Sequence, residues 1–146
     1  MKMSWQTLDV IADSVNPILA VIALIWPWLR WRGSWRQAGL NVLVTLLSVG
    51  LAFGVSALDG KFGWWPSAGL DFSTHTAISI ALIVSLGSIK PSTWMAWTAV
   101  LLGYFVLMVY QRYHTWADIG TTAVVIAPPL LAARWWLAKR QAGQIV

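Results

Sequence analysis

The amino-acid sequence predicts an all-α protein: a polytopic bundle of about five transmembrane helices, forming one integral membrane domain over residues 1–146. Apolar residues make up 58% of the chain and charged residues only 10%, whereas soluble domains carry about 25% charged residues. Polar side chains are therefore too few to cover a water-soluble globule. The 12 tryptophans agree with a lipid environment, because Trp collects at membrane–water boundaries.

Five apolar segments approach the roughly 20 helical residues that cross a bilayer core about 30 Å thick. We expect the spans at about 10–29, 38–58, 73–89, 93–110 and 117–138. The third segment is short and is followed by Pro91, as is common beyond a helix end. Pro128-Pro129 is expected to kink the fifth segment.

The first segment is interrupted by polar residues. Asp13 and Asn16-Pro17 lie inside it, so its outer end is expected to be kinked or partly wet. Asp9 and Asp13 also fall where the apolar core of a cleavable signal would lie. We therefore expect this segment to be retained as a span.

The basic residues are distributed unequally between the two sides, which orients the bundle by the positive-inside rule. Seven share the side predicted to be cytoplasmic: Arg30, Arg32, Arg36, Lys90, Arg134, Lys139 and Arg140. The other side holds Lys2, Lys61 and Arg112, both histidines and all five acids: Asp9, Asp13, Asp59, Asp71 and Asp118. We expect a bacterial inner-membrane protein with a cytoplasmic C-terminus and its polar chemistry on the periplasmic face. The net charge of +5 is thus assigned to helix ends, not to nucleic-acid binding.

Two short polar stretches begin the third and fifth spans on that outer face. In the first, Ser73 can cap the helix, and the amides of Ser73, Thr74 and the rest of the first turn offer an anion site beside His75. In the second, His114 and Asp118 are four residues apart and share a helix face. A carboxylate that holds one imidazole nitrogen leaves the other free as a nucleophile. One attacking histidine, one orienting aspartate and one proton-donating histidine suit displacement at phosphorus.

Each of these residues also has a structural interpretation. An isolated HxxxD occurs by chance in many helices, and a capping serine beside an interfacial histidine explains the other stretch. Arg112 could equally be an interfacial residue whose charge reaches water, and an aromatic belt explains Trp64-Trp65 better than a headgroup entrance. The combination on one membrane face nevertheless favours a functional site.

The role of several acids stays open. Asp71 could bind a metal or pair with Arg112 or Lys61, although a solvated loop acid is the default. Asp13 could face the site or lie in interfacial water. The histidines and aspartates do not form a recognisable zinc pattern, and no cofactor or metal is predicted. With no cysteine, disulfide and thiol chemistry are excluded.

These stretches resemble two of the three motifs of the type 2 phosphatidic acid phosphatase superfamily, which are KxxxxxxRP, PSGH and SRxxxxxHxxxD. Residues 72–75, Phe-Ser-Thr-His, resemble PSGH, and residues 114–118 resemble HxxxD. The likeness is closest to the sphingomyelin synthase branch, whose stretches read FSGHT and HYTxD. The resemblance implies that His114 takes up the phosphoryl group, Asp118 orients it, His75 protonates the leaving group, and Ser73 with adjacent amides holds phosphate oxygens.

The chain departs from the family pattern in its cations. KxxxxxxRP is not recognisable, and Lys61 before Trp64-Trp65-Pro66 is at most a remnant. Met108 stands where the arginine of the third motif would be, a loss that the synthase branch shares. Lys61 and Arg112 are the cations close enough in sequence to substitute for phosphate binding. Family members usually have six spans, and this chain is expected to have five.

The predicted activity is hydrolysis of a lipid-linked phosphate through a phosphohistidine, without a cofactor. The alternatives are transfer of a lipid headgroup to an alcohol, and a non-catalytic lipid-binding or transport protein. The expected partners are a lipid phosphate substrate and membrane lipids, with no nucleic acid. A second copy of the chain could cover a lipid-facing seam.

Overall fold

The computed structural model describes residues 5–31 and 34–142. Every regular element in these ranges is helical, which confirms the all-α class. The elements are α1 (Trp5–Arg30), α2 (Trp35–Phe62), α3 (Trp64–Ser67), α4 (Thr74–Ile89), the 3-10 turn η1 (Pro91–Thr93), α5 (Trp94–Tyr110) and α6 (Trp116–Ala142). Lys2 and Arg32, which entered the charge count, lie outside the described residues.

Four of the helices are long and apolar enough to cross a membrane: α1, α2, α5 together with η1, and α6. Side chains such as Leu47 and Val124 are 63% and 74% exposed on their surfaces, as expected of residues that face lipid. These features identify an integral membrane protein. The remaining expected span, 73–89, corresponds to α4, which has 16 residues and is about 24 Å long at 1.5 Å per residue.

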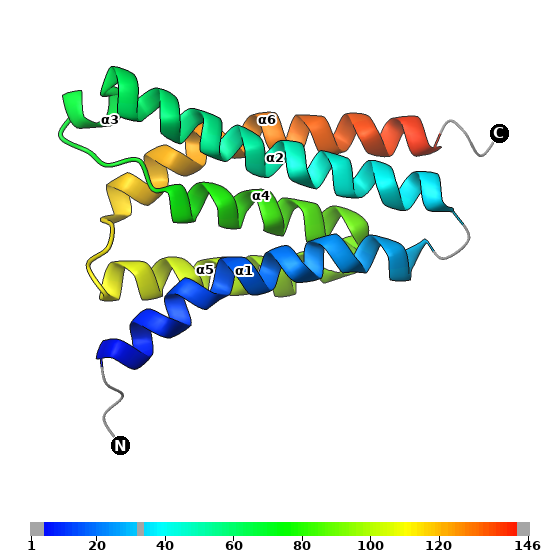
Figure 1. The fold of residues 1–146 in the computed structure, drawn as a ribbon, viewed down its shortest axis with the longest axis horizontal. Helices are drawn as coiled ribbons and strands as arrows, with labels where there is room; N and C mark the ends of the chain where they lie inside the picture. The colour runs from blue at the N-terminus through cyan, green and yellow to red at the C-terminus, as the bar shows by residue number, and fades with distance from the viewer. Residues whose placement is uncertain (1–4, 32–33, 143–146) are drawn as a thin grey trace.

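The short helix α4 is the centre of the bundle. In Figure 1 it runs between α2 and α6 on one side and α1 and α5 on the other, and it packs against all four. Twelve of its sixteen residues are buried. This position explains why its sequence is apolar all round, since no face of α4 looks outward.

The long helices change direction around prolines. Pro17 lies inside α1 and Pro128-Pro129 inside α6, and both ribbons bend part-way along their length (Figure 1). A proline within a helix removes a backbone hydrogen bond and clashes with the preceding turn. The part of α1 before Pro17 includes Asp9, which accepts hydrogen bonds from Gln111 and Tyr113 just after α5.

The bundle has two chemically different ends. The ends of α2 and α5 and the starts of α4 and α6 meet at one of them, which we call the histidine end (Figure 1, left). At the other, the basic end, α1 and α4 terminate, α2 and α5 begin and α6 reaches its last turns. The basic end carries the exposed cations Arg30, Arg36, Lys90, Lys139 and Arg140.

Arg134 is an exception to the charge pattern expected from the sequence. Instead of lying at a helix end, its side chain is inside the bundle and only 4% exposed. The guanidinium donates to Asn41 Oδ1 (3.1 Å) and Thr45 Oγ1 (2.7 Å) of α2, and to Ser85 Oγ (2.6 Å) of α4. It therefore joins α6 to the two helices beside it through neutral partners.

Candidate functional site

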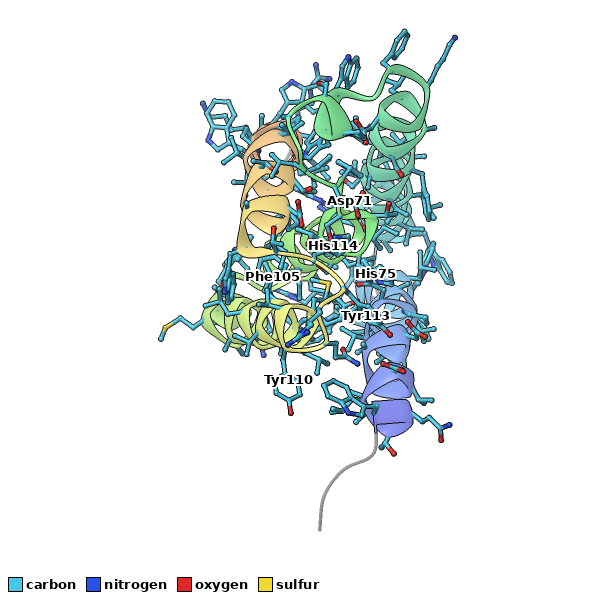
Figure 2. The ribbon with its side chains drawn as sticks, turned by 90° about the vertical axis from the view of Figure 1, so that its left-hand side faces the viewer. Asp71, His75, Phe105, Tyr110, Tyr113 and His114 are labelled. Atoms are coloured by element: carbon cyan, nitrogen blue, oxygen red, sulfur yellow. The ribbon has the colours of Figure 1, made fainter. Side chains whose placement is uncertain are left out.

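The site at the histidine end is a surface hollow of about 440 Å³ between the end of α5 and the start of α6. Its lining comprises Asp71, Val109, Arg112, Tyr113, His114, Thr115, Trp116 and Asp118. Figure 2 looks onto this end, where the labelled Asp71, His75 and His114 lie centrally and Tyr110 points outward. Three of the residues predicted from the sequence, His114, Asp118 and Arg112, thus come together in one hollow.

The turn that closes α5 carries Arg112 into the hollow. The amide of Arg112 donates to the Val109 carbonyl and that of Tyr113 to the Met108 carbonyl, both at 3.0 Å. These two bonds form a Schellman motif, which requires a left-handed residue just after the helix. Glycine is usual there, but Arg112 occupies it with φ of 60°. The backbone accepts a strained conformation at the one cation that lines the hollow among the described residues.

His114 lies on the wall of the hollow with one nitrogen facing a carboxylate. Its Nδ1 is 3.5 Å from Oδ2 of Asp71, and the His114 side chain is 10% exposed while that of Asp71 is 71% exposed. Burial lowers the pKa of His114 below its ordinary value of 6.5, and the neighbouring Asp71 and Asp118 oppose this effect. The imidazole is therefore largely neutral at pH 7.

The carboxylate of Asp118 makes different contacts from those that the HxxxD spacing predicts. Its Oδ1 accepts from the Asp71 amide (2.8 Å), and its Oδ2 accepts from the amide (2.8 Å) and hydroxyl (2.7 Å) of Thr115. No hydrogen bond joins Asp118 to His114 among the described residues. Asp118 thus fixes the loops on either side of the hollow, and Asp71 is the carboxylate beside the imidazole.

His75 lies deeper, in the first turn of α4, and is not part of the hollow's lining. Its Nδ1 is 3.0 Å from the Tyr104 hydroxyl of α5, and its carbonyl accepts from Asn16 Nδ2 (3.3 Å) of α1. It is close enough to His114 for its charge to lower the pKa of that residue. The two imidazoles therefore lie at the same end of the bundle, with His75 deeper inside it than His114.

The helix start that was expected to hold phosphate is already hydrogen-bonded within the protein. Ser73 is fully buried; its hydroxyl caps α4 by accepting from the Thr76 amide (3.2 Å), and its own amide donates to Thr122 Oγ1 (3.1 Å). The Thr74 hydroxyl is 3.0 Å from the hydroxyl of Ser56. The expected cap is confirmed, whereas Ser73 and Thr74 present no group to the hollow.

Lys61 also lies apart from the hollow's lining. It is exposed near the end of α2, with Nζ 5.4 Å from the centre of the Phe62 ring. The segment that follows is held by Asp59, whose buried carboxylate accepts from the Trp65 amide (2.8 Å). Trp65 in turn donates to Thr121 Oγ1 (3.0 Å) of α6. This chain of contacts positions the loop that leads to Asp71.

Three hydrogen bonds at this end were not foreseen from the sequence. Asp9 of α1 accepts from Gln111 Nε2 and from the Tyr113 hydroxyl, each at 2.9 Å. The bond from the Tyr113 hydroxyl raises the pKa of Tyr113 above 10. Tyr104 provides the partner of His75. Asp9 is more than 100 positions from Tyr113 in the chain, so no local spacing signals the contact.

Comparisons with protein-family models, curated proteins and solved structures gave no match to this chain. The likeness to phosphatidic acid phosphatases therefore depends on the two short motifs alone. Within the described residues, no three His or Asp side chains gather as a metal-binding group.

Proposed function

We propose that the protein is a membrane enzyme that hydrolyses a lipid-linked phosphate, with His114 as the nucleophile. The observation that supports this most directly is that His114 Nδ1 lies 3.5 Å from Asp71 Oδ2, close to it but not hydrogen-bonded, at the wall of a hollow that also contains Arg112. A neutral imidazole, an orienting carboxylate and a cation are the groups that a phosphoryl transfer through histidine needs.

In the proposed reaction, Nε2 of His114 attacks phosphorus and the bond from phosphorus to the lipid oxygen breaks. Asp71 stabilises the positive charge that develops on the imidazole, and Arg112 offsets negative charge on the phosphoryl oxygens. The leaving oxygen takes up a proton, for which His75 is the proposed donor after a small movement towards the hollow. Water then attacks phosphorus, the bond from phosphorus to Nε2 breaks, and His75 takes up the proton of the water, which restores both histidines and releases phosphate.

The surroundings of the hollow support a substrate from the bilayer. Trp116 and Tyr113, which line it, are 57% and 43% exposed, and such aromatic side chains prefer the membrane–water boundary. A phosphate headgroup could enter the hollow while its acyl chains stay beside the helices. In this proposal α4 crosses the membrane as a fifth, short span, and the histidine end faces the periplasm of a bacterial cell.

Two related functions remain as alternatives with their own support. If an alcohol replaces water in the second step, the same residues perform headgroup transfer. A non-catalytic lipid-binding role is favoured by the hydrogen bonds that already occupy Ser73 and Thr74, since only Arg112 then remains to neutralise a phosphate.

The test is phosphate release by purified protein from phosphatidic acid, phosphatidylglycerol phosphate and a polyprenyl diphosphate in mixed micelles. We expect release by the wild type and a loss of at least 100-fold in His114→Gln, because general-base and nucleophilic groups contribute factors of about 10² to 10⁴. Tyr110→Gln, on the outward-pointing Tyr110, is the matched control. A ³²P-labelled protein intermediate should form in the wild type and in Tyr110→Gln but not in His114→Gln. Equal phosphate release from wild type and His114→Gln would contradict the mechanism.

A further inference from the structure

The second half of α1, from Pro17 to Arg30, carries three adjoining hollows on its surface. The first, of about 580 Å³ at the basic end, is lined by Arg30 and Lys90 together with Trp26, Leu29, Pro91 and Ser92. The second, of about 410 Å³, shares Trp26 and Leu29 with it and continues along α1 to Val21. The third, of about 260 Å³, shares Val21 and Ile22 with the second and reaches Pro17. The second and third are lined by residues of α1 alone, so the three together form one shallow surface groove whose character changes from basic to apolar.

We propose that this groove binds one anionic phospholipid, with its phosphate between Arg30 and Lys90 and an acyl chain along α1 from Leu29 to Pro17. The site is separate from the proposed catalytic hollow, which lies at the other end of the bundle.

Charge complementarity requires the ligand to be an anion that comes from outside the chain. All five aspartates of the sequence belong to the histidine end, at positions 9, 13, 59, 71 and 118, and the chain has no glutamate. Arg30 and Lys90 come from different elements, the end of α1 and the residue after α4, yet line the same hollow. Two convergent cations with no acid beside them among the described residues suit a lipid phosphate.

The dimensions of the groove fit one leaflet. From Leu29 to Pro17 is a rise of about 18 Å along a helix, and half of a bilayer core about 30 Å thick is about 15 Å. Trp26 lies between the basic and apolar parts, with its ring edge-on to Trp97 at 5.8 Å. This is the depth at which Trp marks the boundary between headgroups and acyl chains. A zwitterionic lipid would fill the apolar part but leave the two cations without a net countercharge.

The test measures lipid binding by native mass spectrometry of the detergent-purified protein, with phosphatidylglycerol, phosphatidylcholine and soluble glycerol phosphate as separate probes. We expect one retained phosphatidylglycerol and weaker binding of the other two. Loss of each cation should weaken binding about fivefold, so Arg30→Gln with Lys90→Gln should weaken it about 25-fold. The pair Arg36→Gln with Lys139→Gln removes the same charge from the same end outside the hollow, and should change binding less than twofold.

The apolar part is tested by filling it. Val21→Trp places a bulky ring in the groove and should weaken phosphatidylglycerol binding, whereas Val124→Trp on the exposed surface of α6 should not. All variants should keep the wild-type thermal midpoint without added lipid, because the altered side chains lie on the surface. Equal binding of phosphatidylcholine, equal loss in both cation pairs, or equally tight binding of glycerol phosphate would each overturn the proposal. So would a lipid-free dimer that Val21→Trp alone abolishes, since a second copy would then occupy the groove.

Discussion

Asp71 and Asp118 are the two carboxylates whose charges act on His114, and their different surroundings suit them to different roles. Asp71 is exposed and faces Nδ1 of the imidazole at 3.5 Å. Asp118 is 6% exposed, and both of its oxygens accept hydrogen bonds from loop residues. A group that stabilises a transient charge on His114 must be close to the ring, which favours Asp71.

Asp71→Asn should change the titration of His114. Burial already lowers the pKa of His114 below 6.5 and Asp71 raises it in part, so removing the negative charge should lower this pKa further. Because the folded-state pKa of His114 lies below the unfolded one, the contribution of this residue to stability is full above about pH 6.5 and falls as His114 becomes protonated at lower pH. Imidazole NMR signals measure this directly, since the chain has two histidines and His75→Gln assigns them. An unchanged or raised pKa of His114 in Asp71→Asn would contradict the pairing.

Arg112→Gly separates the charge of Arg112 from its role in the fold. Glycine adopts the left-handed conformation without strain, so the variant should be as stable as the wild type or more stable by up to about 1 kcal/mol. Phosphate release should nevertheless fall at least tenfold if this cation stabilises the transition state. Thermal unfolding measures the effect on stability, and the release assay measures the effect on activity. Unchanged release would make Arg112 an interfacial cation only.

At the scale of whole elements, two side chains of α6 form hydrogen bonds to segments that are distant in the sequence. Asp118 of α6 ties down the loop before α4 and the loop after α5. Arg134, 16 residues further along α6, joins that helix to α2 and α4 by hydrogen bonds. One end of α6 thus organises the site and the other organises the bundle.

Asp118→Asn should loosen the histidine end. An amide group keeps one acceptor oxygen and brings a donor against a backbone N–H, so either the Asp71 or the Thr115 contacts are lost, at a cost of about 1–3 kcal/mol. Hydrogen exchange at the amides of Asp71 and Thr115 should accelerate. Asp13→Asn is the matched control: Asp13 is exposed on α1, and the change should cost less than about 0.5 kcal/mol. Equal protection of both amides in Asp118→Asn and the wild type would contradict this role.

Ser85→Ala tests the interior network of Arg134. The Ser85 hydroxyl accepts from the guanidinium at 2.6 Å, and a hydrogen bond to a charged group contributes about 1.5–3 kcal/mol. Among the described residues, the neighbouring Ser88 hydroxyl bonds only to the Val84 carbonyl of its own helix. Ser85→Ala should therefore lower the free energy of unfolding by about that amount, and Ser88→Ala by less than about 0.5 kcal/mol. Similar effects of the two changes in thermal or denaturant unfolding would show that the Ser85–Arg134 bond contributes little.

At the scale of the whole molecule, the apolar segments predicted the helices well because burial in lipid imposes a length and a composition. All five expected segments are helices, although α1 starts at Trp5 and α2 continues to Phe62, beyond the apolar windows. The polar residues in these extensions, such as Asp9 and Asp59, are tolerated because they bond to other elements. Hydropathy alone does not register such partners.

The end of the bundle that carries the candidate site could be predicted from the sequence, but the contacts of its residues could not. Charge and motif position brought His75, His114 and Asp118 to one end, as in the structure. The spacing rule paired Asp118 with His114 because both were expected on one helical face, but α6 begins at Trp116 and His114 precedes it. The partner of His114 instead comes from the loop before α4, and Arg134 is satisfied by neutral groups of two other helices. Such long-range pairings depend on the packing of the bundle.

The short length of α4 bears on the orientation of the whole molecule. Because α4 is surrounded by longer helices, its start, with His75, lies recessed at the histidine end (Figure 1).

The orientation of the bundle can be tested with single cysteines. If the histidine end faces the periplasm and α4 is a span, the exposed residue Ser67 is outside the cell and Arg140 is inside it. The chain has no cysteine, so Ser67→Cys and Arg140→Cys each supply one thiol. A membrane-impermeant maleimide should label Ser67→Cys in intact cells and Arg140→Cys only after permeabilisation, with permeabilised cells as the control for reactivity. The reverse pattern would place His114 in the cytoplasm. Labelling of both thiols from one side would mean that the chain crosses the membrane an even number of times between them. In that case α4 would not be a span.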